Sequence, residues 1–190
     1  TTTDNFLLPL LADRDPDAPL AWRAGVPVSA RQFLADVARF APELPDDGPA
    51  VNLCVDRYAF AVSLGAALMR GHASLLPPDA RPDTLARLAE SGGPRLFTLV
   101  DDPKLQTPGM RRVLIEDRSS LEGNPNAAVP RIEAGMHAVS LLTSGSTGVP
   151  QPHAKTWGTL VGDVAVAVKR LCRVLGRSSL EGLTLVATVP

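Results

Sequence analysis

An excess of charge of either sign is missing from this sequence of 190 residues. Its 19 Lys and Arg residues are balanced by 20 Asp and Glu residues, which leaves a formal net charge of -1 at pH 7. Proteins that bind nucleic acids normally owe much of their affinity to a positive surface. The charge balance therefore argues against a nucleic-acid partner.

Cysteine is also scarce, because only Cys54 and Cys172 are present. They stand far apart in apolar runs and match no metal-ligand spacing, and a small secreted scaffold would carry more cysteines. We predict that both are buried thiols in a reducing, cytoplasmic compartment rather than partners in a disulfide.

Long apolar runs are absent as well. The longest, residues 59–69, is too short to span a membrane and is followed by Arg70. The first four residues, Thr1 to Asp4, lack the basic start and apolar middle of a signal peptide. We therefore expect a cytoplasmic protein with no membrane span.

The residues that are present describe a globular domain. Hydrophobic residues make up 45% of the sequence and charged residues 21%, and the length suits one domain with a sizeable core. Strand-like and helix-like segments alternate, which predicts an α/β fold with a layered, largely parallel sheet and flanking helices. The expected helices are 5–11, 30–41, 58–70, 82–90 and 156–175. The expected strands are 26–29, 50–55, 73–76, 96–100, 113–116, 139–143 and 183–189.

Three of these segments carry more specific signals. Ser29 and Gln32 form a capping-box pattern at the start of the helix 30–41. Apolar residues recur along 156–175 at the spacing of a buried helical stripe, from Val161 to Leu175. Residues 118–133 are polar and rich in proline, so we expect a surface connection there.

One segment carries the clearest chemical signal. At the last residue of the strand 139–143 begins a run of six residues that are all Gly, Ser or Thr: Thr143, Ser144, Gly145, Ser146, Thr147 and Gly148. Backbone amides in such a loop can surround an anion, and glycine lets the backbone approach phosphate oxygens closely. The hydroxyl groups add neutral donors. The sequence therefore predicts a phosphate-binding loop between a strand and the helix 156–175.

Other interpretations of this loop are weaker. A flexible Gly/Ser linker would join domains, whereas this run lies between two strong elements. A Walker-type loop requires Gly-Lys-Ser/Thr five residues after its first Gly, and Pro150 stands five residues after Gly145. Neither the Gly-x-Gly-x-x-Gly pattern of a dinucleotide site nor the Gly-x-Ser-x-Gly pattern of a serine hydrolase is present.

The segment from Thr143 to Pro150 resembles the phosphate-binding signature of the AMP-binding, adenylate-forming superfamily. This superfamily includes acyl- and aryl-CoA synthetases, peptide-synthetase adenylation domains and luciferases. Three further segments resemble the parts of the family that precede the signature, although less specifically: 27–34, 58–78 and 96–100. The likeness implies that residues 1–190 are the N-terminal part of the large AMP-binding domain, a subdomain of the acyl-CoA synthetase-like fold, truncated and without the small C-terminal domain.

The resemblance also implies a two-step reaction. A carboxylate attacks the α-phosphate of ATP to give an acyl-adenylate and pyrophosphate, and a thiol of CoA or of phosphopantetheine then takes the acyl group. The partners would be a small carboxylic acid and, where phosphopantetheine is used, an acyl carrier protein. By position, the six residues from Thr143 to Gly148 would hold the β- and γ-phosphates. The ligand of Mg²⁺ is expected outside this chain, so we name no catalytic or metal-binding residue, and we expect the chain alone to be inactive.

The sequence departs from the family at a few positions. Family members commonly have Lys-Gly after the proline, where this chain has Gln151 and Pro152. Lys155 could supply the missing cation and His153 a donor, or Lys155 could be a solvated residue near a helix start. Trp157 stands where the family often has His, and its ring could line an acyl pocket or, as we favour, anchor the core.

Other residues invite weaker hypotheses. His72 and His137 have no partners at metal-ligand spacing, so structural or exposed positions are expected. Asp13, Asp15 and Asp17 lack the Gly and Glu of a calcium loop and are interpreted as solvated. Two alternative functions stay open. A non-catalytic nucleotide- or partner-binding module of the same fold is favoured by Gln151, and a kinase-like phosphate binder is disfavoured because two prolines separate the loop from the helix.

Overall fold

The computed structural model describes residues 6–116, 128–143 and 151–184. The helices are α1 (Ala30–Phe40), the 3₁₀ turn η1 (Ala41–Glu43), α2 (Arg57–Met69), α3 (Pro82–Gly92) and α4 (Trp157–Leu175). The strands are β1 (Leu7–Pro9), β2 (Pro19–Arg23), β3 (Val26–Ser29), β4 (Ala50–Asn52), β5 (Ser74–Leu76), β6 (Phe97–Val100), β7 (Arg111–Leu114), β8 (Arg131–Glu133), β9 (His137–Thr143) and β10 (Gln151–Thr156).

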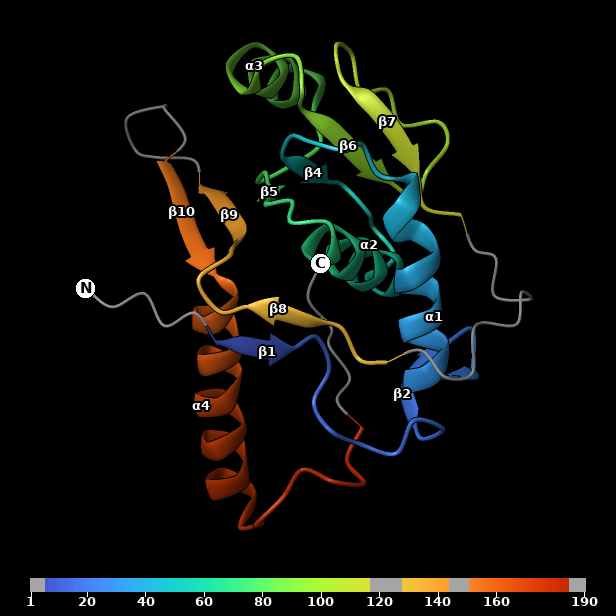
Figure 1. The fold of residues 1–190 in the computed structure, drawn as a ribbon, viewed down its shortest axis with the longest axis vertical. Coiled ribbons are helices and arrows are strands. Elements are labelled where there is room, and N and C mark those ends of the chain that lie inside the picture. Colours follow the sequence, from blue (N-terminus) through green and yellow to red (C-terminus); the bar gives the residue numbers. More distant parts are fainter. Residues whose placement is uncertain (1–5, 117–127, 144–150, 185–190) are drawn as a thin grey trace.

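Six strands form the central sheet, in the order β10-β9-β5-β4-β6-β7 (Figure 1). All neighbouring pairs are parallel except β9 and β10, which run antiparallel. Helix α2 connects the parallel strands β4 and β5, whereas residues 101–110 connect β6 to β7 without a helix. The predicted α/β class is confirmed, and the sheet is mixed because of its antiparallel edge strand.

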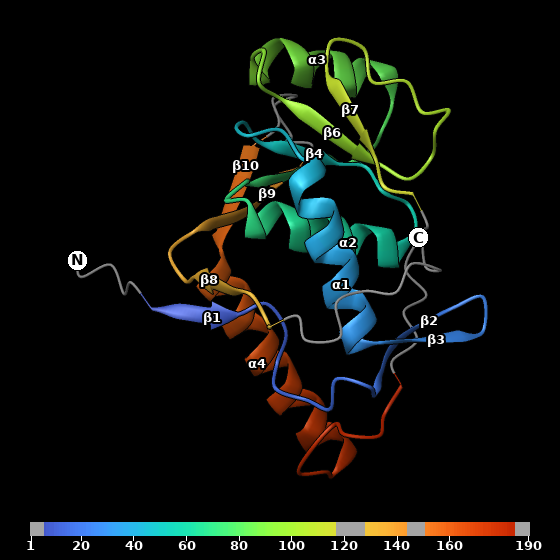
Figure 2. The same cartoon turned by 45° about the vertical axis from the view of Figure 1, so that its right-hand side comes forward.

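Helices cover both faces of this sheet. Figure 2 shows α3 above the sheet, and α1 and α2 below it. Because strand side chains alternate between faces, Ala50 and Phe97 pack toward α1 and α2, whereas Val51 and Leu96 pack toward Leu85 of α3. The core therefore consists of two apolar layers on either side of the sheet.

Helix ends follow the local sequence signals. The Ser29 hydroxyl accepts the Gln32 backbone N–H at 3.1 Å, which confirms the serine half of the capping box predicted for α1. The Gln32 side chain donates to the Asp36 carboxylate at 3.2 Å. The next turn, η1, contains Pro42 directly after α1. Helix α3 begins at Pro82 and ends before Gly93, whose φ of 75° lies in the region that favours glycine.

Two smaller sheets accompany the central one. Strands β2 and β3 form a hairpin that projects beside α1 (Figure 2), through a turn in which Ala24 and Gly25 have positive φ. Strand β1 pairs with β8, which corrects two predictions. The predicted helix 5–11 is wrong over its described residues, and the predicted connection 118–133 includes a strand, whereas residues 117–127 lie outside the described ranges.

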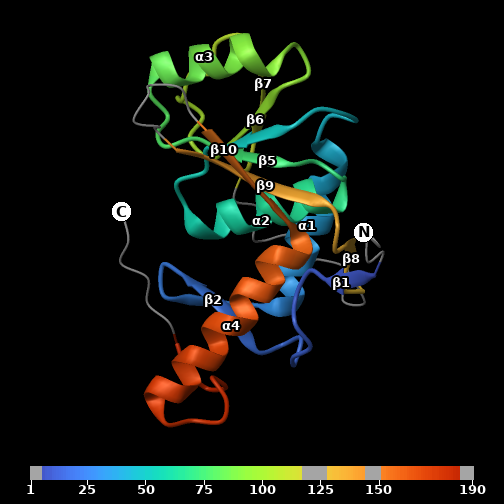
Figure 3. The ribbon, with the colours of Figure 1, turned by 90° about the vertical axis from the view of Figure 1, so that its left-hand side faces the viewer.

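Helix α4 has the predicted length, but its apolar stripe is not buried. The first turn packs through Trp157 and Leu160 against Ile132 and Val139. Beyond that turn Val164 is 62% exposed and Leu175 is 50% exposed. Figure 3 shows α4 extending away from the central sheet, so the described residues leave most of its apolar face uncovered.

Some of the sequence predictions are only partly confirmed. Both cysteines are free thiols, half-buried rather than fully buried. Of the predicted strand 183–189, Leu183 and Thr184 have no strand conformation and the rest lies outside the described residues. Within the described ranges, no helix has the length and apolar character needed to cross a bilayer.

Candidate functional site

The Gly/Ser/Thr-rich segment lies between two paired strands. Thr143 is the last residue of β9 and pairs with Gln151, the first residue of β10. The predicted phosphate-binding residues Ser144, Gly145, Ser146, Thr147 and Gly148 lie outside the described residues. The structure therefore defines where this segment leaves and re-enters the sheet, while the role of each residue stays a prediction.

The place of Thr143 in the central sheet indicates where a ligand could bind. Strand β9 is parallel to β5, so Thr143 leaves the sheet at the edge where the other parallel strands also have their carboxyl ends. In open α/β sheets, ligands bind in the crevice beyond the carboxyl ends of the strands. The Gly-rich segment thus begins at the edge at which a ligand site is expected.

Strand β10 is the part of this site that sequence reasoning missed. We expected the loop to lead directly into the helix, but β10 intervenes and returns antiparallel along β9. We did not predict this strand because it contains Pro152, and proline is rare inside sheets. It is tolerated here because β10 is an edge strand, and its other side bonds to no strand among the described residues.

Lys155 lies near the far end of β10 and pairs with Asp163 of α4. Its Nζ is 2.5 Å from the Asp163 carboxylate, and both side chains are partly exposed. Lys155 stands four positions after Gln151 in β10, a distance of about 14 Å along the strand. That exceeds the reach of a lysine side chain toward the paired ends of the loop. His153 lies closer to the loop and is exposed.

Trp157 occupies the first position of α4. Its backbone N–H donates to the Met136 carbonyl at 2.9 Å, and its ring packs in the cluster around Leu68 and Val139. This contact is the core anchor that we favoured from the sequence. The indole Nε1 is buried and has no hydrogen-bond partner among the residues that the structure describes, which is uncommon for a buried Trp.

A separate polar cavity of about 180 Å³ lies between α1, α2 and the residues that follow β6 and β7. Its buried centre is Asp36, which accepts from the Tyr58 hydroxyl at 2.7 Å and from the Arg39 guanidinium at 2.8 Å. Burial, and then the hydrogen bond to Asp36, raise the pKa of Tyr58 well above its usual range. At the rim, Asp101 accepts the backbone N–H groups of Val55 and Asp56.

This polar cavity was not predicted, although one signal for it exists. Asp36 stands three residues after Phe33, on the apolar face of α1. A buried carboxylate needs partners, so an aspartate at that position points to a polar network. Tyr58 and Asp36 tie α2 to α1, and Asp101 ties the residues after β6 to the loop after β4.

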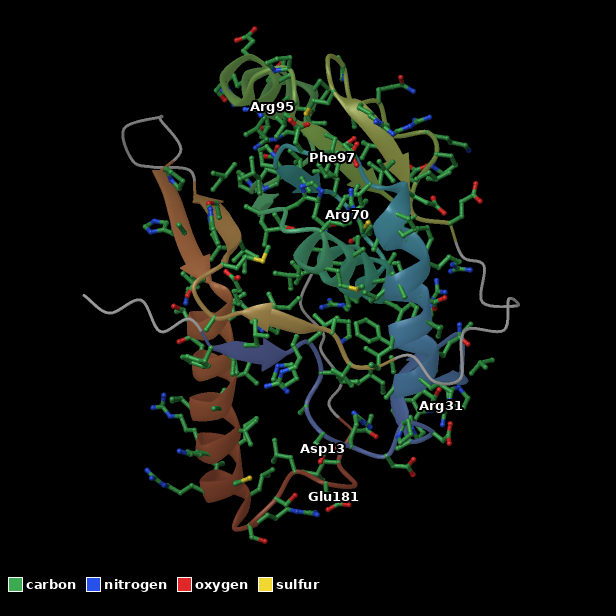
Figure 4. All side chains as sticks on the ribbon, viewed as in Figure 1. Asp13, Arg31, Arg70, Arg95, Phe97 and Glu181 are labelled. Carbon is green, nitrogen blue, oxygen red and sulfur yellow. The ribbon has the colours of Figure 1, made fainter. Side chains whose placement is uncertain are left out.

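The other candidate residues occupy structural positions. His72 is buried and His137 contacts the Ser140 hydroxyl at 2.9 Å. Asp13, Asp15 and Asp17 are exposed, as predicted, and Asp13 lies in the lower part of the molecule in Figure 4, above Glu181. Over the ranges that the structure covers, no group of three His, Cys, Asp or Glu side chains could hold a metal ion.

Solved structures with a similar fold settle the architecture. The o-succinylbenzoate CoA synthetase from Bacillus subtilis, bound to its acyl-adenylate intermediate, matches 83% of this chain with a TM-score of 0.59 and 18% identity. A malonyl-CoA ligase bound to methylmalonyl-CoA and AMP matches 87% with a TM-score of 0.60 and 20% identity. The chain has the fold of adenylate-forming enzymes.

A third structure with the adenylate-forming fold is the adenylation domain of a keto acid-selecting peptide-synthetase module, at 16% identity and a TM-score of 0.57 over 76% of this chain. The chain spans 41%, 34% and 30% of the three matched chains, and so corresponds to only part of the adenylate-forming fold. No protein-family model and no curated protein sequence matches this chain.

Proposed function

We propose that this chain contributes the triphosphate-binding loop to an ATP-dependent ligase that activates a carboxylic acid as its acyl-adenylate. The observation that carries the proposal is the placement of a six-residue Gly/Ser/Thr run at the carboxyl end of β9, within a sheet shared with adenylate-forming enzymes. Fold likeness alone leaves function open. The loop composition at this edge supplies the chemical argument.

The proposed task of the loop is to hold a polyanion. Backbone amides from Thr143 to Gly148 would donate to the β- and γ-phosphates, and Gly145 and Gly148 would let the chain approach them. The hydroxyl groups of Ser144, Ser146 and Thr147 would add donors without adding charge. Fixed donors of this kind offset the repulsion between the triphosphate and an incoming carboxylate.

The remaining components are proposed for the whole enzyme. The matched structures hold ATP with magnesium, AMP or a CoA product. By analogy, the complete protein would bind ATP, Mg²⁺ and a small carboxylic acid, and would pass the acyl group to CoA or to the phosphopantetheine of a carrier protein. As the family resemblance implies, the Mg²⁺ ligands are proposed to lie outside this chain. We place the reaction in the cytoplasm.

A second candidate is a non-catalytic nucleotide- or partner-binding module. Gln151 stands where the family commonly has Lys, and Lys155 is paired with Asp163 at 2.5 Å. A loop without a nearby cation would bind the triphosphate less tightly and would neutralise less of its charge during the reaction.

Carboxylate-dependent ATP–pyrophosphate exchange distinguishes the two functions. It would be measured on this chain and on the complete gene product, with aryl, fatty and amino acids offered in turn. We expect exchange only from the complete product, and a loss of at least about tenfold in the Ser146→Ala, Thr147→Ala variant. Ser178→Ala, an exposed serine after α4, is the matched control. ATP binding without exchange, for every acid, would support the non-catalytic module.

A further inference from the structure

Helix α4 carries an apolar stripe that the described residues leave largely open. The stripe consists of Val161, Val164, Val168, Leu171 and Leu175, which recur every three or four residues and therefore share one side of the helix. The first turn of α4 packs against the core, but no residue of the helix is fully buried. Because α4 extends away from the central sheet in Figure 3, the stripe is accessible along about 17 Å of helix, from Val164 to Leu175.

The second half of α4 and the residues after it are strongly basic. Four cationic residues and no acidic residue stand between positions 164 and 180, although the whole chain has a net charge of -1. They are Lys169, Arg170, Arg173 and Arg177, and all four are exposed. The one carboxylate of the helix belongs to Asp163, near its other end, where it pairs with Lys155. This part of the surface is therefore positive and apolar at once.

The cations lie beside and behind the stripe rather than within it. An α-helix turns by about 100° per residue, so Lys169 lies about 100° around the helix from Val168. By the same geometry Arg173 lies about 140° and Arg170 about 160° from Val168. Arg173 in the last turn also stabilises the end of the helix, but Lys169 and Arg170 precede that turn. The helix thus has one apolar side and a cationic flank.

We propose that α4 docks on the surface of an anionic lipid bilayer, with its stripe at the boundary between the head groups and the acyl chains. A helix with one apolar side and a polar side rich in Lys and Arg lies parallel to the bilayer plane. The stripe leaves water, while Lys169 and Arg173 extend their long side chains to the anionic head groups. The inference uses no residue of the Gly-rich segment and is independent of the function proposed above.

The chemistry and size of the stripe favour a bilayer over a protein partner. Beyond its first turn α4 contains no Trp, Tyr or Phe, and these aromatic residues commonly anchor protein interfaces. The open stripe is about 17 Å long on a helix about 10 Å wide, so its outline covers less than about 200 Å². Each partner of a stable protein complex buries about 800 Å². A second copy of this chain would gain too little area from the stripe alone, whereas a bilayer needs no matching surface.

Flotation with lipid vesicles tests the proposal on the wild-type chain. One set of vesicles contains equal parts of phosphatidylcholine and phosphatidylglycerol, and the other contains phosphatidylcholine alone. Each Lys or Arg near an anionic surface raises the binding constant about fivefold, so we expect at least about tenfold tighter binding to the anionic vesicles. Added salt should weaken that binding. Equal binding to both sets, or binding to neither, would overturn the proposal.

Two variants with the same added charge test the stripe. Val168→Asp places a carboxylate in its centre, whereas Val166→Asp places one about 160° away, at a residue that is 65% exposed. Burial of a valine side chain is lost only in Val168→Asp. We therefore expect Val168→Asp to bind the anionic vesicles at least about tenfold more weakly than Val166→Asp. Equal binding by the two variants would show that the stripe does not enter the lipid and would overturn the proposal.

A double variant tests the cationic flank. Lys169→Gln combined with Arg173→Gln removes two charges beside the stripe, and we expect binding to the anionic vesicles to fall at least about tenfold. Arg87→Gln combined with Arg111→Gln is the matched control, because it removes two charges from exposed residues of α3 and β7. Equal losses in the two double variants would mean that only the net charge matters, and would overturn the assignment to α4.

The remaining measurements identify other occupants of the stripe. Circular dichroism first establishes that each variant keeps the helix content of the wild type. Concentration-dependent sedimentation that Val168→Asp abolishes, without vesicle binding, would assign the stripe to a second copy of the chain. Vesicle binding by this chain but not by the complete gene product would show that another part of that protein covers α4. Either result would overturn the proposal.

Discussion

At the scale of single residues, the hydrogen bond between Tyr58 and the buried carboxylate of Asp36 can be tested by one substitution. Tyr58→Phe removes the hydroxyl that donates to Asp36 at 2.7 Å, but it keeps the ring that packs on Phe33. A hydrogen bond to a charged group contributes about 1.5–3 kcal/mol, so we expect a loss of that size in the free energy of unfolding, measured in urea.

The control for Tyr58→Phe is a double-mutant cycle with Asp36→Asn. We expect the two effects to be coupled, because both variants remove the same contact. Independent, additive losses would show that the hydroxyl acts elsewhere.

Cys54 provides a residue-scale prediction that depends on pH. Burial raises the pKa of its thiol to about 12. A thiol in an unfolded chain ionises near pH 8.5, so between these values the unfolded chain releases a proton that the folded chain keeps. Stability contributed by the neutral thiol is present below about pH 8.5 and is lost as the pH rises. We expect Cys54→Ala to flatten the decline in stability above pH ~8.5.

Thiol labelling checks the same property of Cys54. At about pH 8 the thiol of Cys54, half-buried and with a raised pKa, should react with a thiol reagent more slowly in the folded protein than in urea. Labelling of Cys54 at equal rates in folded and unfolded chains would contradict the raised pKa of its thiol. Cys172→Ser keeps the second thiol out of the measurement.

At the scale of elements, we expect truncation of an apolar side chain to cost much more stability in α3 than in α4. Leu85 of α3 is fully buried, so Leu85→Ala should cost about 2–5 kcal/mol of unfolding free energy. Val164 of α4 is 62% exposed, so Val164→Ala should change stability by no more than about 0.5 kcal/mol in this chain. Thermal and urea unfolding measure both, and a large loss for Val164→Ala would mean that something covers α4 in solution.

The amino-terminal cap of α4 provides a second test at this scale. The Thr156 hydroxyl accepts the Thr159 backbone N–H at 3.2 Å. Thr156→Ala removes this acceptor and should cost about 0.5–2 kcal/mol, whereas Thr156→Ser keeps it and should cost less. Circular dichroism during urea unfolding measures the change, and equal losses for Ala and Ser would argue against capping.

At the scale of the whole molecule, local signals in the sequence predicted the layered sheet and the four helices. Ser29, Pro82 and Gly176 mark helix ends because their chemistry acts within one turn. The pairing of β1 with β8 was not predictable in this way, since it joins segments far apart in the chain. The stripe of α4 was predicted as buried because periodicity reports an apolar face and not what covers it. The Gly-rich loop was found by composition, while β10 behind it was hidden by Pro152.

The distance along the chain between β1 and β8 has a consequence for synthesis. The Arg131 guanidinium donates to the Leu7 carbonyl across a separation of 124 residues. A ribosome adds about 5–20 residues per second, so the partner of β1 emerges roughly 6–25 s after β1 itself. During that interval the backbone N–H and C=O groups of β1 are unpaired and can pair with another chain. We expect the newly made chain to need chaperones most before β8 has been synthesised.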